Sequence, residues 1–194
     1  LLEVRPNRDE VYKSDGSVDY VRQGSERFVD LIAVGPDLKK MAAKGLTAVW
    51  FEQKYLSVLT KDPSGSYRYE STLKALELAQ EPVSLSADGS KLKLKTERPG
   101  EFYVVFKDSE GTELNRLDYS VAGEGNVSRS LERNAELQVK LNKKDYAPGE
   151  TIELQVTAPY AGAGIITIER DKVFQWKAFK TSTTASVQTI TVPE

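Results

Sequence analysis

Apolar and polar residues alternate along several short stretches of the chain. Leu92 and Leu94 alternate with lysines in the first half, and Ile152, Leu154 and Val156 alternate with polar residues in the second. Successive side chains of a β-strand point to opposite faces, so alternation gives a strand with one apolar and one polar face. The pattern therefore predicts half-buried strands in both halves of the chain.

Turn-forming residues separate these stretches at short intervals, which is typical of antiparallel sheets in sandwiches or barrels. They are Asp15-Gly16, Gly35-Pro36, Asp62-Pro63-Ser64-Gly65, Asp88-Gly89, Pro99-Gly100, Glu110-Gly111 and Pro148-Gly149. We expect strands at 27–34 and 46–59, and a three-stranded meander over 91–95, 101–107 and 114–121. The predicted fold class is all-β and antiparallel.

Two stretches fit more than one structure. Residues 36–45 could form a helical turn or a loop. In 71–80, Leu73, Leu76 and Ala79 fit a helical stripe, whereas Leu76 and Leu78 fit a strand. We favour a strand for 71–80, because the surrounding sequence predicts β structure.

The two halves of the chain share a sequence pattern. Residues 19–36 and 145–159 both begin with Asp-Tyr, reach a glycine, and enter an alternating strand that ends near a proline. The copies are offset by about 125 residues, roughly one sandwich domain. The second copy leaves about 60 residues, too few for a seven-stranded sandwich of about 100. We therefore expect the end of a preceding module or a linker at 1–16, a β-sandwich at 17–124, a polar linker at 125–134 and a partial second β-sandwich at 135–194.

Composition excludes several classes of function. Lys and Arg number 27 against 29 Asp and Glu, a net charge of −2 without the basic excess of a nucleic-acid binder. The chain has no His and no Cys, which removes Ser-His-Asp catalysis, thiol chemistry and the commonest transition-metal ligands. No apolar run approaches the roughly 18 residues that span a bilayer. We expect no nucleic-acid partner, no direct membrane insertion and no enzymatic activity.

The motifs that could carry a site favour structural roles. For Tyr146, Pro148 and Gly149, turn chemistry favours a connection between strands over a recognition loop. The scattered carboxylates favour a solvated charged surface over a glycosidase pair. Residues 14–19 and 107–113 contain acidic side chains, yet neither has the spacing of a Ca²⁺ loop.

Two further motifs depend on context. Asn126-Val127-Ser128 fits the N-glycosylation pattern, whose meaning depends on a secretory host. Trp50 and Trp176 could stack on a sugar or a base, but packing in a core or between modules is favoured in the absence of a basic groove. We therefore assign no catalytic, cofactor-binding or metal-binding residue and expect no cofactor.

One long stretch resembles a known family. Residues 141–177, "LNKKDYAPGETIELQVTAPYAGAGIITIERDKVFQWK", are similar to the macroglobulin-like domains of the α2-macroglobulin family, especially its bacterial members. "SGSYRYES", "RPGEFYVVFKDSEGTE" and "DYSVAGEG" resemble the preceding module of that family. The resemblance covers about Val18 to Glu194 and implies two tandem sandwiches of the macroglobulin, immunoglobulin or fibronectin type III kind, the second incomplete.

The resemblance also implies a function. Members of this family are large protease traps: an attacking protease cuts a bait segment, and the protein then encloses it. Many members also capture the protease through a thioester between a Cys and a Gln, which this chain cannot form because it has no Cys; "FEQK" at 51–54 is predicted to be strand sequence. We expect a scaffold portion of a bacterial broad-spectrum protease inhibitor, with the bait segment after Glu194.

The expected partners are proteases, reached through the full-length parent, and neighbouring macroglobulin-like domains. The expected location is the periplasm or cell envelope of a bacterium. The alternative is a set of immunoglobulin-like modules from a cell-surface adhesin or a polysaccharide-binding protein. A carbohydrate-active enzyme with accessory sandwiches is a weaker third hypothesis.

Overall fold

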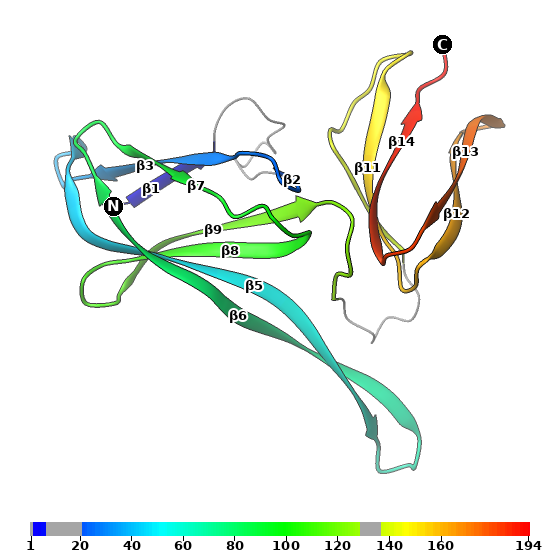
Figure 1. Ribbon diagram of the computed structural model, residues 1–194, viewed down its shortest axis with the longest axis horizontal. Coiled ribbons are helices and arrows are strands. Elements are labelled where there is room, and N and C mark those ends of the chain that lie inside the picture. Colours follow the sequence, from blue (N-terminus) through cyan, green and yellow to red (C-terminus); the bar gives the residue numbers. More distant parts are fainter. Residues whose placement is uncertain (1, 7–20, 129–136) are drawn as a thin grey trace. The chain divides into compact units, whose positions relative to one another are not determined.

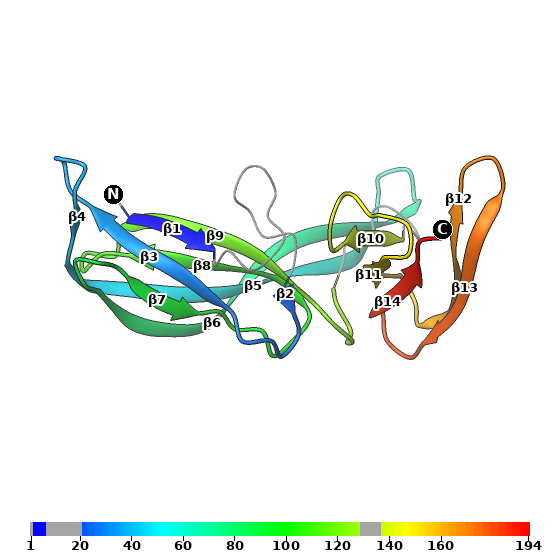
Figure 2. The ribbon, with the colours of Figure 1, turned by 90° about the horizontal axis from the view of Figure 1, so that it is seen from above.

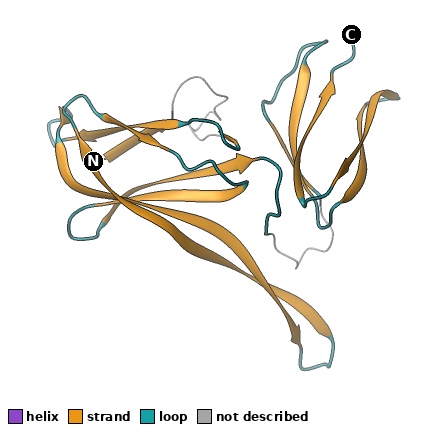
Figure 3. Cartoon of the chain, in the orientation of Figure 1, coloured by secondary structure: helices purple, strands orange, loops and turns teal. Residues whose placement is uncertain are grey.

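The computed structural model describes residues 2–6, 21–128 and 137–194, and within these ranges all regular structure is β (Figure 3). The all-β prediction is confirmed. Two compact units are present: unit 1 comprises 1–54 and 74–121, and unit 2 comprises 55–73 and 122–194. The expected segment at 1–16 lies largely outside the described residues, as does the expected linker beyond residue 128.

Unit 1 contains two antiparallel sheets (Figure 1). The five-stranded sheet has the order β2 (Val21–Arg22), β9 (Glu113–Ala122), β8 (Gly100–Lys107), β5 (Ala43–Lys61) and β6 (Tyr67–Leu85). In the other sheet, β3 (Phe28–Val34) pairs with β1 (Leu2–Pro6), β4 (Lys40–Met41) and β7 (Ser90–Lys93). The strands predicted at 27–34, 46–59, 101–107 and 114–121 are therefore all present.

The core of unit 1 lies between the inner faces of these two sheets. Val29 and Leu31 of β3 are buried in one cluster with Trp50 of β5 and Phe106 of β8. Their alternation along each strand matches the predicted period of two. Removing such a side chain from water contributes about 1.5–3 kcal/mol, so burial of this apolar cluster stabilises the unit.

The predicted meander is wrong in one strand. Residues 101–107 and 114–121 pair as expected, but β7 pairs with β3 in the opposite sheet, with Leu92 opposite Val29. The chain after β7 crosses between the sheets, where the Tyr119 hydroxyl donates to the Lys95 carbonyl at 3.0 Å. Alternation shows which residues face the core, but both sheets share that core, so it cannot choose between them.

The two ambiguous stretches are resolved in favour of β structure and loop. Residues 71–80 lie inside the long strand β6, which confirms the strand prediction. Residues 36–45 contain a turn and the two-residue strand β4, with no helical turn. Leu38 adopts a left-handed φ of 61° in that turn.

Two of the hairpin turns, at Asp62 and at Asp108, share one hydrogen-bonding arrangement. Asp62 Oδ1 accepts from the backbone N–H groups of Ser64 and Ser66 at 2.9 and 3.0 Å. Asp108 Oδ1 accepts equivalently from Glu110 and Thr112, both at 2.9 Å. A side-chain acceptor that satisfies turn N–H groups favours this tight connection.

The turn between β6 and β7 requires glycine for a steric reason. Gly89 has a φ of +102°, and a Cβ added there would lie 2.7 Å from the carbonyl oxygen of Leu31. A side chain is excluded by both the backbone conformation and the close approach of β3.

Unit 2 contains a three-stranded sheet and a hairpin (Figure 2). The sheet has the order β10 (Gln138–Leu141), β11 (Thr151–Thr157) and β14 (Ala185–Thr191), and the hairpin pairs β12 (Gly162–Glu169) with β13 (Val173–Thr181). Leu154, Val156 and Ile190 form its buried core, against which Ile152, Ile166, Ile168 and Phe179 pack. Leu137, Val139 and Leu141 also alternate with polar residues, a pattern typical of a half-buried strand, yet all three are exposed.

The predicted internal repeat has a structural counterpart. Gly24 and Gly149 both adopt a left-handed φ, of 73° and 80°. Each N–H donates to a backbone carbonyl distant in sequence, Gly24 to Thr96 at 2.8 Å and Gly149 to Val192 at 3.0 Å. In each copy a strand with alternating buried apolar positions follows, three in β3 and two in β11. In both copies, therefore, a left-handed glycine that makes a long-range backbone hydrogen bond precedes the first long strand.

Candidate functional site

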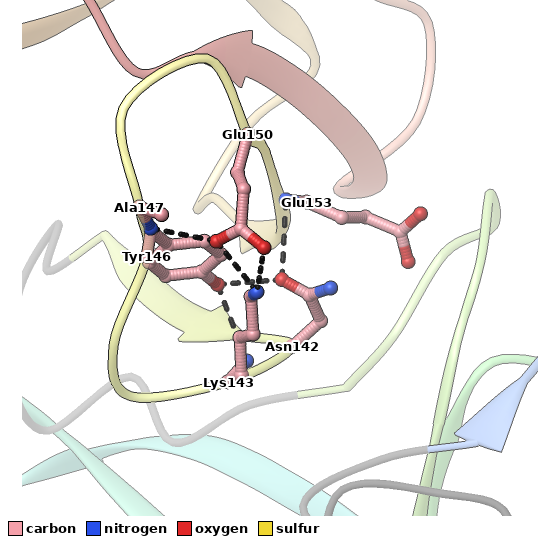
Figure 4. A network of polar contacts seen from close by, with 6 residues as sticks. All are labelled: Asn142, Lys143, Tyr146, Ala147, Glu150 and Glu153. Atoms are coloured by element: carbon pink, nitrogen blue, oxygen red, sulfur yellow. Dashed lines mark hydrogen bonds and ion pairs between the residues drawn. The ribbon is translucent and has the colours of Figure 1, made fainter.

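The segment between β10 and β11 is held by its own polar groups (Figure 4). The Tyr146 hydroxyl donates to Asn142 Oδ1 at 2.5 Å and accepts from the Lys143 backbone N–H at 3.2 Å. Lys143 Nζ lies 2.8 and 2.7 Å from the two carboxylate oxygens of Glu150, and 5.0 Å from the centre of the Tyr146 ring. These groups close the turn around Pro148-Gly149.

Glu150 is the acidic centre of this network. Its carboxylate accepts from Lys143 Nζ and also from the Ala147 backbone N–H, at 2.7 Å. These two hydrogen bonds, the first being the larger cause, hold the pKa of Glu150 below its ordinary value. Because both donors stabilise the charged carboxylate, the hydrogen bonds that hold the turn are strongest when Glu150 is ionised.

The same turn is joined to the chain that follows β14. Gly149 N–H donates to the Val192 carbonyl at 3.0 Å, and Val192 N–H donates to the Glu150 carbonyl at 2.8 Å. The polar groups of Tyr146 and Glu150 are thus committed within unit 2. This geometry agrees with the structural interpretation of Tyr146, Pro148 and Gly149 over a recognition loop.

A buried side-chain amide fixes the chain at Gly123, near the start of the second segment of unit 2. Gln155 of β11 is 8% exposed, and its Oε1 accepts from the Gly123 N–H at 3.1 Å while its Nε2 donates to the Gly123 carbonyl at 3.4 Å. We call this pair the Gln155 clamp. Sequence reasoning missed it, because the alternation placed Gln155 on the polar face of the strand.

The residues just after Gly123 are also hydrogen-bonded. Gly125 and Ala185 exchange two backbone hydrogen bonds, at 3.2 and 2.9 Å. Asn126 Oδ1 accepts from the Thr184 N–H at 3.3 Å, so the side chain of the predicted glycosylation motif binds the protein itself. Ser128 Oγ accepts from the Tyr55 N–H at 3.0 Å. The described part of the expected linker, 125–128, therefore follows a defined path within unit 2.

The two tryptophans have different environments. Trp50 is 1% exposed in the core of unit 1, with Lys95 Nζ 4.7 Å from its ring, whereas Trp176 on β13 is 63% exposed. The packing interpretation is confirmed for Trp50, but Trp176 is not packed in the core of unit 2. Ile165 and Phe174 are exposed on the same hairpin, whose opposite face carries Ile166, Ile168 and Phe179 into the core.

The acidic side chains do not converge in the described ranges. No group of three or more Asp, Glu, His or Cys residues is placed to hold a metal ion there. The loop 107–113 forms the turn already described, in which Asp108 Oδ1 binds backbone N–H groups, and 14–19 lies outside the described residues. In this part of the chain, no helix is long and apolar enough to cross a membrane. The expectation that no catalytic or cofactor site exists stays a prediction.

Sequence comparisons give the affiliation of the chain. A family model described as the alpha-2-macroglobulin bait region domain matches residues 137–194. An alpha-2-macroglobulin homolog from Yersinia pestis is 48% identical over 181 residues, 93% of this chain and 9% of that relative. Alpha-2-macroglobulin from Pasteurella multocida is 42% identical over 183 residues, 94% of this chain and 10% of that relative. The chain belongs to the alpha-2-macroglobulin family.

A solved structure supports the fold assignment. The native conformation of Escherichia coli alpha-2-macroglobulin matches with a TM-score of 0.50 at 17% identity, covering 100% of this chain and 15% of that one. This likeness concerns the macroglobulin-like β architecture alone. The chain spans about a tenth of the length of the curated alpha-2-macroglobulins that it matches.

The family match also bears on the bait segment. The matched model is described as the bait region domain of alpha-2-macroglobulins, and it covers residues 137–194, the part of the chain expected to precede the bait segment. The expected place of the bait segment after Glu194 therefore stays a prediction.

Proposed function

We propose that this chain is a scaffold portion of a bacterial alpha-2-macroglobulin that acts as a broad-spectrum protease trap. Its partners are proteases, reached through a bait segment outside this chain, and neighbouring macroglobulin-like domains of the parent. It performs no catalysis itself, and the parent works in the periplasm or cell envelope. The domain division proposed is a sandwich at 17–124, a linker at 125–134 and a partial sandwich at 135–194.

The observation that carries this proposal is identity of 48% across 93% of the chain to a bacterial alpha-2-macroglobulin homolog. The described polar groups support a scaffold role. Within unit 2, the Gln155 clamp fixes the chain where β9 ends, and Val192 fixes it where β14 ends. A trap that changes shape only after cleavage needs parts that hold their geometry beforehand, and these contacts supply it in unit 2.

The test uses the full-length parent. Substoichiometric amounts of several unrelated proteases are added, the earliest cut is mapped by mass spectrometry, and size-exclusion chromatography shows whether the protease stays attached. We expect different proteases to cut one shared segment after Glu194 and to elute with the compacted product. The 194-residue chain alone serves as control and is expected to retain none of them.

Two outcomes would overturn the proposal. Early cuts spread over unrelated linkers, with every protease eluting free, would exclude trapping. Specific retention of a glycan or surface ligand by the same preparation would then favour the adhesin hypothesis.

A further inference from the structure

The hairpin of β5 and β6 extends beyond the neighbouring strand of its sheet (Figure 1). Strand β5 runs over Ala43–Lys61 but pairs with β8 only over Thr47–Gln53. Beyond that point, in the described structure, β5 has β6 as its strand partner, so the tip 55–73 is a two-stranded ribbon. Such ribbons are marginally stable in water unless one face packs against something.

Hydrogen bonds in the tip define which side chains share a face. The Asp62 N–H donates to the Ser66 carbonyl at 2.8 Å, which sets these two residues opposite each other. Counting back along both strands places Ser57 opposite Ser71, and their hydroxyl oxygens are indeed 2.6 Å apart. Lys61 falls opposite Tyr67, and its Nζ lies 5.7 Å from the centre of that ring. Two independent contacts therefore fix the register.

One face of the tip carries aromatic and aliphatic side chains on either side of the Ser57–Ser71 pair. In this register Leu59 lies opposite Tyr69 and Tyr55 opposite Leu73, and Tyr67 continues the same face towards the turn. We call these residues, Tyr55, Leu59, Tyr67, Tyr69 and Leu73, the tyrosine face. All five are between 38% and 65% exposed. The only charged side chain on this face in 55–73 is that of Lys61, next to the turn.

The opposite face of the same ribbon differs in character. Leu56 and Val58 lie there with Thr60 and Thr72, and the ion pair of Arg68 with Glu70, at 2.9 Å, belongs to the same face. Charged residues are depleted, and Tyr is enriched, at the centres of protein interfaces. The contrast distinguishes the tyrosine face as the side suited to burial.

We propose that the tyrosine face docks onto another domain of the same parent polypeptide. The occupant is an apolar surface that offers acceptors to three tyrosine hydroxyls. The curated relatives are about ten times as long as the part this chain matches, so other domains are tethered nearby, and tethering raises the effective concentration of a partner to about the millimolar range. A freely diffusing partner relies more on charge for encounter, and this face has almost none.

This inference rests on family membership and is independent of protease trapping, so its test needs no protease. In the full-length parent, Tyr69 is replaced by the photo-crosslinking residue p-benzoylphenylalanine. The matched control carries the same residue at Val58, which is at least as accessible but lies on the opposite face. After irradiation we expect crosslinks within one polypeptide, at monomer mass, from position 69 to a single other domain, with about tenfold less product from position 58.

The alternatives give different results. Crosslinked dimers from position 69 would show that a second copy occupies the face and would overturn the proposal. Crosslinks only after a protease is added would assign the face to the protease and would also overturn it. Equal crosslinking from positions 58 and 69, or none from either, would show that the face is simply solvated.

A second measurement guards against a locally disturbed hairpin. Hydrogen exchange of the amides in 55–73 is compared between the parent and two double variants, L59T/Y69T and L56T/V58T. Thr keeps the β preference of the strand, so both variants retain the ribbon. We expect exchange about tenfold faster in L59T/Y69T alone, whereas equal effects of the two variants would contradict docking through the tyrosine face.

Discussion

Units 1 and 2 differ in what holds them together. Unit 1 encloses a large apolar cluster in which Trp50, Phe106 and Leu31 are almost fully buried. The core of unit 2 is a cluster of three buried apolar residues, and the Gln155 clamp and the Glu150 network add polar contacts to it. A small core leaves a larger share of the stability to specific hydrogen bonds, whose geometry is stricter than that of apolar burial. We therefore expect unit 1 to respond most to lost volume and unit 2 to lost polar contacts.

The largest effect is expected from Phe106→Ala in unit 1. The ring is fully buried, and its removal leaves a cavity between the two sheets, so unfolding of unit 1 should become easier by about 3–5 kcal/mol. Trp50 fluorescence during urea denaturation, in a Trp176→Phe background, reports on this unit alone. The control Phe174→Ala removes an exposed ring from unit 2 and should leave the transition unchanged. A loss of less than about 1 kcal/mol in the free energy of unfolding of Phe106→Ala would contradict this description of the core of unit 1.

The Gln155 clamp should give the next largest effect. Gln155→Leu leaves the N–H and carbonyl of Gly123 without their side-chain partner in a buried site, at a cost of about 1–3 kcal/mol. Hydrogen exchange of peptides from 137–194 should accelerate, together with the amide of Gly123. The same change at the exposed Gln175 should be neutral. Equal behaviour of the two variants would show that the clamp contributes nothing.

Gly164 tests the packing of the hairpin against the small core. A Cβ at this position would lie 2.6 Å from Cζ of Phe179, so Gly164→Ala requires the ring to move and should destabilise unit 2 by about 1–2 kcal/mol. Gly162→Ala is the control, because a Cβ there meets nothing within 4 Å. Combining Gly164→Ala with Phe179→Leu should recover part of the lost stability. Hydrogen exchange of peptides from 137–194 measures this stability in each variant. No recovery would point to a backbone cause instead.

The smallest effect concerns pH. The pKa of Glu150 is lowered from its ordinary value of 4.5 by Lys143 and Ala147, so its contribution to stability is present above about pH 4.5 and is lost as pH falls through the lowered folded pKa. Glu150→Gln should therefore destabilise unit 2 slightly at pH 7 and make no difference in strong acid, where the carboxyl group is protonated in both the folded and the unfolded chain. Lys143→Met should abolish most of this pH dependence. A difference in stability between the parent and the Glu150→Gln variant that persists in strong acid would exclude the ionised carboxylate as its source.

Much of the fold could be predicted from alternation and turn residues, because both are local. The strands of β3, β5, β8, β9 and β11 follow from alternation or β-branched and aromatic content, and Gly149 takes the left-handed conformation expected of the Pro148-Gly149 turn. The partner of β7 could not be predicted, because Leu92 fits the shared core from either sheet. Exposed apolar residues on β10 were also missed, since sequence pattern alone cannot show whether a second layer covers a face. Trp176 on β13 is exposed, so its packing between modules stays a prediction.

The candidate surfaces were harder to predict than the fold. Gln155 has the sequence context of a solvated strand position, and its burial depends on Gly123, which is distant in sequence. The tyrosine face depends on a register that the Asp62 turn defines, so its five residues are scattered over two strands in the sequence. A spacing of alternate aromatic and aliphatic residues on both sides of an Asp-x-x-Gly turn is the signal that could have revealed it.

The position of β14 has a mechanical consequence. Its first residue, Ala185, is bonded to Gly125, and Val192, just after its last, is bonded to the turn at Gly149 and Glu150. Tension applied between the segment around Gly125 and the chain after Val192 would therefore pass through the two Gly125–Ala185 hydrogen bonds and then along the backbone of β14. The β12–β13 hairpin lies outside that path, whereas the turn at Gly149 and Glu150 is hydrogen-bonded to its far end, so a pull on the chain after Val192 reaches that turn as well.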